Sequence, residues 1–580
     1  MGRQEIEARW RWAKKFVEAA GSVEPEPLLQ SVFETMIAVA NDEDVQSLRT
    51  EVGEPPHGWN DPWLIGAIHE QVVSATERRD RGAWYTPQKL VVGLVRFAAM
   101  QSDLTGSIKV VDPTCGGGAF LLAAADYLVS QGRSASSVYA DLCGQDIDGL
   151  AVKVTRWALA IWAANHAIGS GVEPVLLQGD ALQTWPVDPG SDQFVVGNPP
   201  FASPLRSGAL PEPAIEFRQE NEEFLGPYAD LAAMHLLRAT EMVGQGSTVV
   251  LVQPQSVLSS RDTERLRSRL DETMPLAGLW VARESVFDAG VRACAPVLRA
   301  RRSDRSRPRV LLAAGREVEP RDPVDPAAWP RLAADALGAP RLPDLNGTLS
   351  EIGVTATAGF RDEYYGLAEA CVEQGAASGT DGGDTCLKLV TVGLIDPLEN
   401  RWGSDSVRFA GKKWSHPAVS LDDLDPKTAA WTKRQLRPKL LVATQAKVLE
   451  PIIDRDGTLV PVTPVLAVHC DPEELDRVAA VLLSPPVVAW AWRTWFGAAL
   501  SVDAVKLSAK QLLQLPLPRN RKKWSASAAL VATTDGLDRA ATTEVTVEVA
   551  SLMTEAYGAD RAVFEWWLNR WGKANVAHDR

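Results

Sequence analysis

A regular alternation of short apolar runs and longer amphipathic runs occupies the sequence from Lys109 to about Ala300. Runs such as IKVVD, EPVLLQGD, FVVGN and STVVLVQP have the length and composition of buried strands, and helix-like stretches such as AFLLAAADYLV and LAVKVTRWALAIWAA separate them. Strands joined by helices of this length run parallel, with helices on both faces of the sheet. The alternation therefore predicts an α/β fold, in which a ligand binds at the carboxyl ends of the strands.

The length of 580 residues exceeds what one ordinary core organises, so several domains are expected. We divide the sequence into a helical N-terminal region, an α/β domain, a connecting segment, a second domain of mixed α+β character and a helical tail. Their expected bounds are 1–80, 81–310, 311–385, 386–535 and 536–580.

The charge, the cysteines and the hydropathy exclude some classes of protein. A net charge of −14 argues against a protein that coats nucleic acid indiscriminately, although local basic segments can still bind phosphate. The six cysteines form no C-x-x-C pair, so we expect reduced thiols and no metal site. The start MGRQEIEARW has no signal-like apolar stretch, and no run reaches the ~20 apolar residues of a membrane helix. We therefore expect a cytoplasmic protein without membrane contact.

A run of three glycines follows the first strand, in the sequence VVDPTCGGGAF. Gly116, Gly117 and Gly118 allow the backbone to approach a ligand closely, and the next helix offers free N–H groups and the positive end of its dipole. This arrangement is typical of a nucleoside-cofactor loop, whereas the G-x-G-x-x-G pattern of a dinucleotide site is absent. An ordinary strand-to-helix turn remains the alternative.

Acidic residues follow the ends of the next two strands. Asp146, in GQDID, can accept hydrogen bonds from both ribose hydroxyls, Ile147 can lie against an adenine face, and Asp148 fits a helix N-cap better. Asp180, in LLQGDAL, can accept from an adenine amino group or cap a turn. Together with Asp112, they predict three acidic strand ends in register at one edge of the sheet.

The fourth strand ends in FVVGNPPFA, which places two rigid acceptors after a buried strand. The Asn198 side-chain carbonyl and the Pro199 backbone carbonyl, held in place by Pro199 and Pro200, can accept both protons of one planar NH₂ group. This draws the nitrogen lone pair away from the ring and makes a weak nucleophile reactive without a strong base. Phe201 would stack on the ring that carries the amine. A strand followed by a proline turn is the alternative.

Five motifs occur in one order along the chain: WYTP (84–87), DPTCGGGAF (112–120), QDID (145–148), GDAL (179–182) and NPPF (198–201). In this order they resemble the adenine-N6 DNA methyltransferases, whose Rossmann-like catalytic domain precedes a target-recognition domain. The resemblance is strong over about 65–300 and weaker over about 359–518. Thr114, Gly117 and Phe201 depart from the usual residues of the family, and Phe201 lacks the hydroxyl of the usual tyrosine.

This resemblance implies S-adenosylmethionine as the cofactor and assigns residues to it. The loop after the first strand, with Thr86 and Pro87, would hold the methionine part. Asp146 and Ile147 would hold the ribose and adenine, and Asp180 the adenine amine. The implied cofactor-binding residues are Thr86, Pro87, Asp112, Thr114, Cys115, Gly116, Gly118, Phe120, Asp146, Ile147, Asp180 and Ala181. The target base would bind at Asn198, Pro199, Pro200 and Phe201, and Phe287 is either a second stacking aromatic or a core residue.

An adenine inside a duplex must rotate out of the stack to reach a pocket at a sheet edge, at a cost of a few kcal/mol. Stacking on aromatic rings returns ~1–3 kcal/mol per base, so phosphate contacts by the second domain must contribute the rest. For each basic segment of that domain, a solvated surface is the alternative. The candidate DNA-binding residues are Lys412, Lys413, Lys433, Arg434, Arg437 and Lys439, with RNRKKW (519–524) as a further basic segment.

The predicted function is methyl transfer from S-adenosylmethionine to N6 of a flipped-out adenine in double-stranded DNA, in a restriction-modification or phage-defence system. One alternative is a different NH₂ acceptor, namely cytosine N4, an RNA base or a protein glutamine. Another is a modification or recognition subunit of a larger restriction complex. No nuclease-like acidic constellation occurs in the first 80 residues, so we expect any cleavage to come from a partner subunit.

Overall fold

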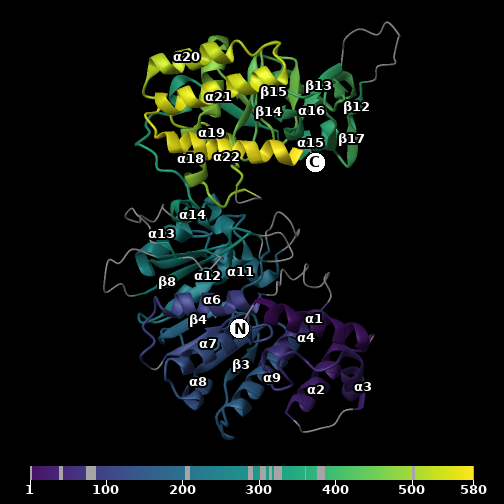
Figure 1. Ribbon diagram of the computed structural model, residues 1–580, viewed down its shortest axis with the longest axis vertical. Coiled ribbons are helices and arrows are strands. Elements are labelled where there is room, and N and C mark those ends of the chain that lie inside the picture. Colours follow the sequence, from purple (N-terminus) through teal and green to yellow (C-terminus); the bar gives the residue numbers. More distant parts are fainter. Residues whose placement is uncertain are drawn as a thin grey trace. The chain divides into compact units, whose positions relative to one another are not determined.

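The computed structural model describes residues 3–21, 23–37, 43–73, 86–106, 108–202, 210–284, 286, 292–300, 309–312, 317–318, 329–359, 361–374, 386–499 and 503–578. The chain divides into two compact units (Figure 1). Unit 1 is Met1–Leu337 and unit 2 is Gly338–Arg580.

A ten-stranded sheet forms the centre of unit 1. Five of its strands are β1 (Lys109–Asp112), β2 (Leu142–Asp146), β3 (Val175–Gln178), β4 (Gln193–Gly197) and β5 (Thr248–Leu251). They lie in the order β3-β2-β1-β4-β5, and each neighbouring pair is parallel. The chain passes from β1 through β2 to β3 and then returns to the other side of β1 with β4. This reversal between β1 and β4 is the switch point at which open α/β sheets bind ligands.

The other edge of the sheet is partly antiparallel. β8 (Ala293–Arg299) runs antiparallel to β5 and to β7 (Leu276–Val281), and β9 (Arg309–Leu312) runs parallel to β7. β10 (Glu317–Val318) pairs with β9, and β6 (Gln253–Pro254) pairs with β8. The sheet therefore continues beyond residue 310, where we expected the α/β domain to end, because β9 and β10 extend its edge.

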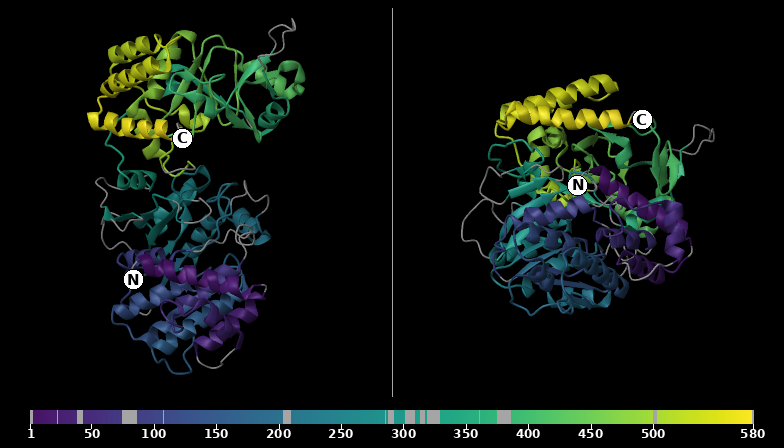
Figure 2. Two further views of the ribbon diagram at one scale, coloured as in Figure 1. Left: turned by 45° about the vertical axis from the view of Figure 1, so that its right-hand side comes forward. Right: turned by 60° about the horizontal axis from the view of Figure 1, so that its bottom comes forward.

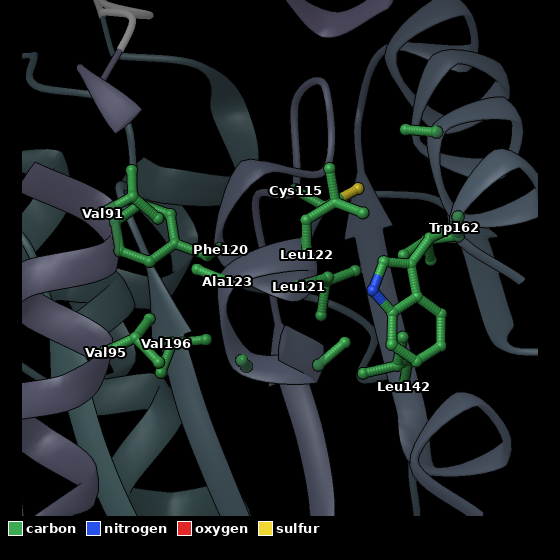
Figure 3. Close-up of a cluster of buried hydrophobic side chains, with 14 of the residues drawn as sticks. Val91, Val95, Cys115, Phe120, Leu121, Leu122, Ala123, Leu142, Trp162 and Val196 are labelled. Atoms are coloured by element: carbon green, nitrogen blue, oxygen red, sulfur yellow. The ribbon is translucent and has the colours of Figure 1, made fainter. Parts of the chain in front are cut away.

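Helices before, between and after these strands complete the α/β part of unit 1. They are α6 (Gln88–Ala99), α7 (Ala119–Ser130), α8 (Ala135–Asp141), α9 (Gly149–Asn165), α11 (Glu212–Glu220), α12 (Leu231–Met242), α13 (Glu264–Thr273) and α14 (Trp329–Ala336). Figure 3 shows part of the core that they enclose: Phe120 of α7 lies against Val91 of α6, and Trp162 of α9 lies beside Leu142 of β2. These side chains are buried, and each contributes on the order of 1.5–3 kcal/mol through loss of apolar surface to water.

The N-terminal helices form an extension of the same unit. They are α1 (Arg3–Ala20), α2 (Pro25–Met36), α3 (Glu43–Val52) and α4 (Trp63–Val72). Helix α4 packs against α1 and α9, and Trp12 and Phe16 of α1 stack in the shared core. The predicted α/β fold with a helical N-terminal extension is confirmed.

Unit 2 contains two four-stranded sheets and two short hairpins. The first sheet has the order β11 (Thr355–Ala358), β22 (Leu466–His469), β19 (Lys439–Ala443) and β20 (Glu450–Asp454). The second has the order β12 (Val372–Glu373), β18 (Pro417–Ser420), β13 (Cys386–Val390) and β21 (Leu459–Pro461). The hairpins are β14 (Ile395–Asp396) with β15 (Glu399–Asn400), and β16 (Val407–Phe409) with β17 (Lys412–Trp414).

Helices complete unit 2. They are α15 (Arg361–Glu369), α16 (Pro426–Gln435), α17 (Leu475–Leu483), α18 (Pro485–Thr494), α19 (Ala509–Leu512), α20 (Arg521–Val531), α21 (Arg539–Ala556) and α22 (Arg561–His578). Helix α21 packs against α20 and α17, and α20 to α22 are the neighbouring yellow helices of Figure 2. The mixed α+β character predicted for this region is confirmed.

Two expected domain boundaries of unit 2 fall inside its packed structure. Strand β11 lies in the expected connecting segment 311–385, yet it pairs along its whole length with β22. The boundary expected at 535 separates α20 from α21, which pack together. These boundaries differ because breaks in composition mark loops, whereas domain limits depend on contacts between distant segments.

No single helix of the described ranges is long and apolar enough to cross a membrane. One bent pair, Pro472–Leu483 with Pro485–Thr494, reaches the required length and composition, with 62° between its two helices. Both α17 and α18 are largely buried within unit 2, as the helices of a protein core are.

Candidate active site

The carboxyl ends of β1 and β2 bring the first two acidic residues to one edge of the sheet. Asp112 pairs with Gly144, so Asp146 lies two residues beyond the position opposite Asp112. Asp146 in turn pairs with Gln178 on β3. Asp180 follows two positions after Gln178. The sequence predicted these three acidic residues in register, but the structure staggers them by two residues from each strand to the next. Because the stagger is an even number of residues, Asp112 and Asp146 point to the same face of the sheet.

The Asp146 carboxylate connects the loops that follow β1 and β2. Oδ2 accepts a hydrogen bond from the Gly116 backbone N–H at 2.9 Å, and Oδ1 accepts one from the Asp148 N–H at 2.9 Å. Each carboxylate oxygen has a second lone pair, so these bonds leave acceptor capacity for hydroxyl groups of a ligand. Asp148 itself caps α9 by accepting from the Leu150 N–H, as the sequence predicted.

Asp112 is a buried acid at the switch point. Its side chain is 1% exposed, and Oδ1 accepts from the Thr114 N–H at 3.1 Å. Burial raises the pKa of Asp112 well above its ordinary value, and the nearby Asp146 carboxylate raises it further. In the described part of the chain, no lysine or arginine forms an ion pair with Asp112. A cationic group of a ligand would restore the charged form of this carboxyl.

The glycine loop has the backbone geometry that close approach to a ligand requires. Gly116 and Gly118 have φ values of 51° and 82°, which side chains other than glycine rarely adopt. The Thr155 hydroxyl donates to the Gly116 carbonyl at 2.8 Å and fixes the loop against α9. A Cβ atom on Gly66 of α4 would lie 3.1 Å from the Gly117 carbonyl oxygen, so α4 lies directly on the loop.

The loop also contains a buried polar atom that a ligand could use. The Thr114 hydroxyl oxygen is buried and has no hydrogen-bond partner among the described residues. A buried hydroxyl without a partner costs on the order of 1–3 kcal/mol, which a polar ligand group would recover. Ile147, next to Asp146, is 65% exposed and offers an apolar surface at the same edge. The donor set therefore fits a nucleoside cofactor with a charged amino-acid part.

Asp180 acts as a cap in this structure. Its Oδ1 accepts from the Leu182 N–H at 2.9 Å, and its backbone carbonyl accepts from the Gln183 and Thr184 N–H groups. The capping alternative for Asp180 is thus realised, and its second carboxylate oxygen lies outside that bond. Direct contact with an adenine amine stays a prediction.

Three implied cofactor residues have buried side chains. Cys115 is 4% exposed, Phe120 is 4% exposed and Ala181 is 2% exposed. Phe120 belongs to the core shown in Figure 3, and burial raises the pKa of the Cys115 thiol well above its ordinary value. Buried side chains of this kind stabilise the loop by packing, and their backbone groups still lie in the loop. Contact of these three residues with the cofactor therefore stays a prediction.

The NPPF segment leaves the sheet directly after β4, beside the glycine loop. A Cβ atom on Gly197 would lie 2.6 Å from Oδ1 of Asp112, so the start of the clamp adjoins the end of β1. The Asn198 Nδ2 group donates to the Thr86 hydroxyl at 2.9 Å. Pro199 is buried, Pro200 is half-buried, and Phe201 is half-buried with one part packed against the core. The structure thus brings together the cofactor loop, the clamp and Thr86.

His235 of α12 was not singled out from the sequence. Its side chain is 5% exposed, and Nδ1 has no hydrogen-bond partner among the described residues. Burial lowers the pKa of His235 to about 4, although the nearby Asp180 carboxylate opposes this shift. The imidazole is therefore neutral at neutral pH. A lone histidine inside an apolar helical run gives no sequence signal for such a position.

The basic residues of unit 2 divide into exposed and buried ones. Lys412 and Lys413 of β17 are exposed, and so are Lys433, Arg434 and Arg437 at and after the end of α16. Lys439 is fully buried in β19, where its ammonium group pairs with Asp454. We therefore withdraw Lys439 from the expected phosphate contacts, because its charge is neutralised inside the protein.

Of the predicted stacking residues, Phe287 lies outside the described residues.

Arg408 is an exposed basic residue that sequence reasoning missed. It lies directly opposite Lys413 in the β16–β17 hairpin. Like charges at opposite positions of a hairpin destabilise it slightly, and both of these side chains are exposed. The Phe409 ring is buried, and the Trp414 indole N–H donates to the Phe409 carbonyl at 2.9 Å. These aromatic residues anchor the hairpin while its cations face solvent.

In the residues that the structure describes, no group of three or more His, Cys, Asp or Glu side chains is arranged to hold a metal ion. Four of the six cysteines are buried, Cys470 is half-buried and Cys386 is exposed, and all are free thiols.

The fold and the site together define a class. A parallel β3-β2-β1-β4-β5 arrangement followed by the antiparallel β8 and β7, with a glycine loop after β1, is a Rossmann-like methyltransferase fold. Residues 61–322 match the model of the family described as N-6 DNA methylase. The chain contains an adenine-N6 DNA methyltransferase domain, and it is an enzyme of that kind, as the motif order predicted.

Solved structures of restriction-modification proteins are similar to this chain to different degrees. The type IIL restriction-modification enzyme MmeI, in a structure with DNA, has a TM-score of 0.61 and 12% identity, covering 89% of this chain and 82% of that one. The type IIG restriction endonuclease BpuSI has a TM-score of 0.41 and 13% identity, covering 95% and 77%. A type I restriction-modification methyltransferase subunit from Streptococcus thermophilus has a TM-score of 0.35 and 18% identity, covering 54% and 71%. At this identity, the likeness to MmeI shows a common fold alone.

Proposed function

We propose that this chain binds S-adenosylmethionine at the carboxyl edge of β1, β2 and β3, and methylates N6 of an adenine rotated out of duplex DNA. One observation carries the proposal. The Gly197 backbone lies so close to the Asp112 carboxyl that a Cβ atom there would be 2.6 Å from Oδ1. The amine clamp that begins at Asn198 and the glycine loop that follows Asp112 are therefore neighbours at the switch point, where donor and acceptor must meet.

The residues at this edge would divide the work of binding. Asp112 and the glycine loop would hold the amino-acid part of the cofactor, since a buried acid without a cation partner attracts an ammonium group. Asp146 would accept from the ribose hydroxyls, and Ile147 would cover one face of the adenine. Bound S-adenosylmethionine supplies a methyl group on a positively charged sulfur.

The clamp residues would act on the target amine. The Asn198 amide oxygen and the Pro199 carbonyl would each accept one amine proton, so that the nitrogen lone pair turns toward the methyl group. The half-buried Phe201 would stack on the adenine ring. The amine nitrogen would gain the methyl group as the bond between that carbon and sulfur breaks, with S-adenosylhomocysteine as the leaving group, and would then lose one proton to water. Positioning and fixed dipoles supply the rate enhancement, without a covalent intermediate on the protein.

Unit 2 would provide the contacts to double-stranded DNA. Its exposed cations at the β16–β17 hairpin and at the end of α16 support this part of the proposal. MmeI, which shares the fold, is a restriction-modification enzyme whose structure was determined with DNA. We extend that setting to this chain and propose a modification role in a restriction-modification or phage-defence system, alone or with partner subunits in the cytoplasm.

The direct test is to identify the modified nucleoside. The purified chain is incubated with unmethylated duplex DNA and methyl-labelled S-adenosylmethionine, and the DNA is digested to nucleosides and separated. We expect the label in N6-methyl-2′-deoxyadenosine. Label in N4-methyl-2′-deoxycytidine, or in RNA or protein offered in parallel, would show that the acceptor is not adenine in DNA.

The matched variant is Asn198→Ala, which removes the amide and keeps the prolines. We expect methylation to fall by roughly a thousandfold or more, because the amine then lacks one of its two acceptors. Binding of S-adenosylmethionine, measured by calorimetry, should stay within about threefold, a range that corresponds to under 1 kcal/mol. Loss of cofactor binding in this variant would assign Asn198 a structural role.

A further inference from the structure

The catalytic amide has one partner that the motif comparison does not explain. The Asn198 Nδ2 group donates to the Thr86 hydroxyl oxygen at 2.9 Å, across 112 residues of sequence. The Thr86 side chain is 5% exposed, so water does not compete freely for this hydrogen bond. The resemblance assigned Thr86 to the methionine part of the cofactor, whereas here its hydroxyl contacts the clamp.

In this hydrogen bond the amide nitrogen is the donor and the Thr86 hydroxyl oxygen is the acceptor. A primary amide is planar, with an acceptor oxygen and a donor nitrogen on the same carbon. When the nitrogen is held by Thr86, the oxygen must point in the other direction. Rotation of the amide by half a turn would instead present two N–H donors to the NH₂ group of the base, and a donor facing a donor cannot stabilise the transition state.

The position of Thr86 is itself fixed by buried polar contacts. Pro87 follows it, and the Pro87 carbonyl accepts from the Leu90 and Val91 N–H groups at the start of α6. The next residue, Gln88, is 4% exposed and accepts a hydrogen bond from Arg9 of α1. Arg9 also forms a buried ion pair with Asp61 at 2.5 Å. The N-terminal helices therefore hold the segment that carries the hydroxyl.

We propose that Thr86 is a positioning residue: its hydroxyl orients the Asn198 amide so that the oxygen faces the target amine. The N-terminal helical extension, through Arg9 and Gln88, holds that hydroxyl in place. This inference rests on the proposed function of the site. It predicts that loss of the Thr86 hydroxyl lowers the rate of methyl transfer and leaves the affinity for the cofactor unchanged.

The test compares Thr86→Val with Thr86→Ser in the full chain. Valine keeps the shape of threonine without the hydroxyl, and serine keeps the hydroxyl. We expect kcat of Thr86→Val to fall roughly tenfold to a hundredfold, because a misplaced catalytic group loses rates of this size. The Kd for S-adenosylmethionine should stay within about threefold of wild type, and Thr86→Ser should retain most of kcat.

A control separates this effect from the general cost of losing a buried hydroxyl. Thr546 of α21 is fully buried, and its hydroxyl donates to the Thr542 carbonyl at 2.8 Å, within the helices of unit 2. Thr546→Val should leave kcat and the Kd for S-adenosylmethionine unchanged. If Thr86→Val does not fold, as judged by its melting temperature, Thr86→Ala is measured against Thr86→Ser in the same way.

Two results would overturn the inference. A rise in the Kd for S-adenosylmethionine that accounts for the whole loss of kcat/KM would make Thr86 a cofactor ligand. An unchanged kcat in Thr86→Val would show that the Asn198 amide orients itself without the hydroxyl. Both results presuppose a wild-type enzyme that methylates adenine, so a wild type without this activity would refute the proposed function instead.

Discussion

Each unit of this protein buries an ionisable residue at a strand, and the two residues differ in whether a group of opposite charge lies beside them. In unit 2, the buried Lys439 ammonium group pairs with Asp454, which also accepts backbone N–H groups from Thr458 and Leu459. In unit 1, the buried Asp112 carboxyl accepts one backbone N–H, and no described cation forms an ion pair with it. The buried lysine already has its counterion inside the protein, whereas the buried carboxyl without one is open to a cationic group of a ligand.

The polar groups outside these pairs differ in the same way. At the proposed site of unit 1, Asp146 of β2 accepts from the Gly116 N–H, and Asn198 donates to the buried Thr86 hydroxyl, across long stretches of sequence. In unit 2, the cations of the β16–β17 hairpin project from an aromatic anchor into solvent. Chemistry on a small group requires a rigid surrounding, whereas phosphate contact requires accessible charge. The predictions below test this contrast in order of decreasing effect.

The largest effect is expected at the junction of clamp and cofactor loop. Gly197→Ala would place a Cβ atom 2.6 Å from the Asp112 carboxyl and 3.3 Å from the Leu251 side chain. We expect unfolding free energy to fall by about 3 kcal/mol, a typical cost of forcing extra volume into a packed core. Denaturant unfolding measures this change.

Two variants give that measurement its controls. Gly93 lies in α6 with nothing within 4 Å of its added Cβ, so Gly93→Ala should stabilise unit 1 by about 0.5–1 kcal/mol. In an Asp112→Ala background, Gly197→Ala should cost much less, because the clashing oxygen is gone. An equal cost in both backgrounds would show that the strain lies elsewhere.

A smaller effect is expected from two buried histidines, one in each unit. Burial lowers the pKa of His235 to about 4, and burial together with Arg437 and Lys439 lowers the pKa of His469 to about 4. Both start from an ordinary value of 6.5, so acidification protonates the unfolded chain before the folded one. Stability present above pH 6.5 is therefore lost as the pH falls toward 4, by about 2 kcal/mol per residue at pH 5.

Unfolding at pH 7.5 and pH 5 checks this prediction. His235→Phe and His469→Phe remove the titrating group from unit 1 and unit 2 respectively, and each should reduce the acid-induced loss by about 2 kcal/mol. If the unfolding free energy falls by the same amount between pH 7.5 and pH 5 in wild type and in a variant, the histidine replaced in that variant does not cause the loss.

The smallest effect on stability is expected at the hairpin. Arg408→Ala and Lys413→Ala remove exposed charges, so unfolding free energy should change by about 0.5 kcal/mol or less. Duplex DNA affinity should fall, and the slope of its logarithm against the logarithm of salt concentration should decrease by about one for each phosphate contact removed. Fluorescence anisotropy over a range of salt concentrations measures this slope.

Lys427→Ala is the matched control in unit 2, because this exposed lysine already pairs with Asp362 at 2.7 Å. Its removal should leave the salt slope unchanged. If Arg408→Ala and Lys413→Ala do not change the salt dependence of DNA affinity, DNA contacts another surface. The exposed cations of this hairpin would then have no role in binding DNA.

The parts of the site that could be predicted from the sequence are those tied to strand ends. Asp112, Asp146 and Asn198 follow apolar runs, and parallel strands place their carboxyl ends at one edge whatever the length between them. The stagger of the acids and the buried side chains of Cys115 and Phe120 could not be predicted, since pairing register and loop orientation depend on packing.

By itself, the sequence determined the class of fold and the order of the motifs, because hydrophobic periodicity and local residue types act over a few positions. It also led to the prediction of an amine clamp at Asn198. Only the tertiary structure decided that Thr86 holds the Asn198 amide, that Lys439 is neutralised inside unit 2 and that Arg408 faces solvent. Each of these depends on a contact between segments far apart in the chain. Such contacts follow from how the whole core packs, and no local pattern records them.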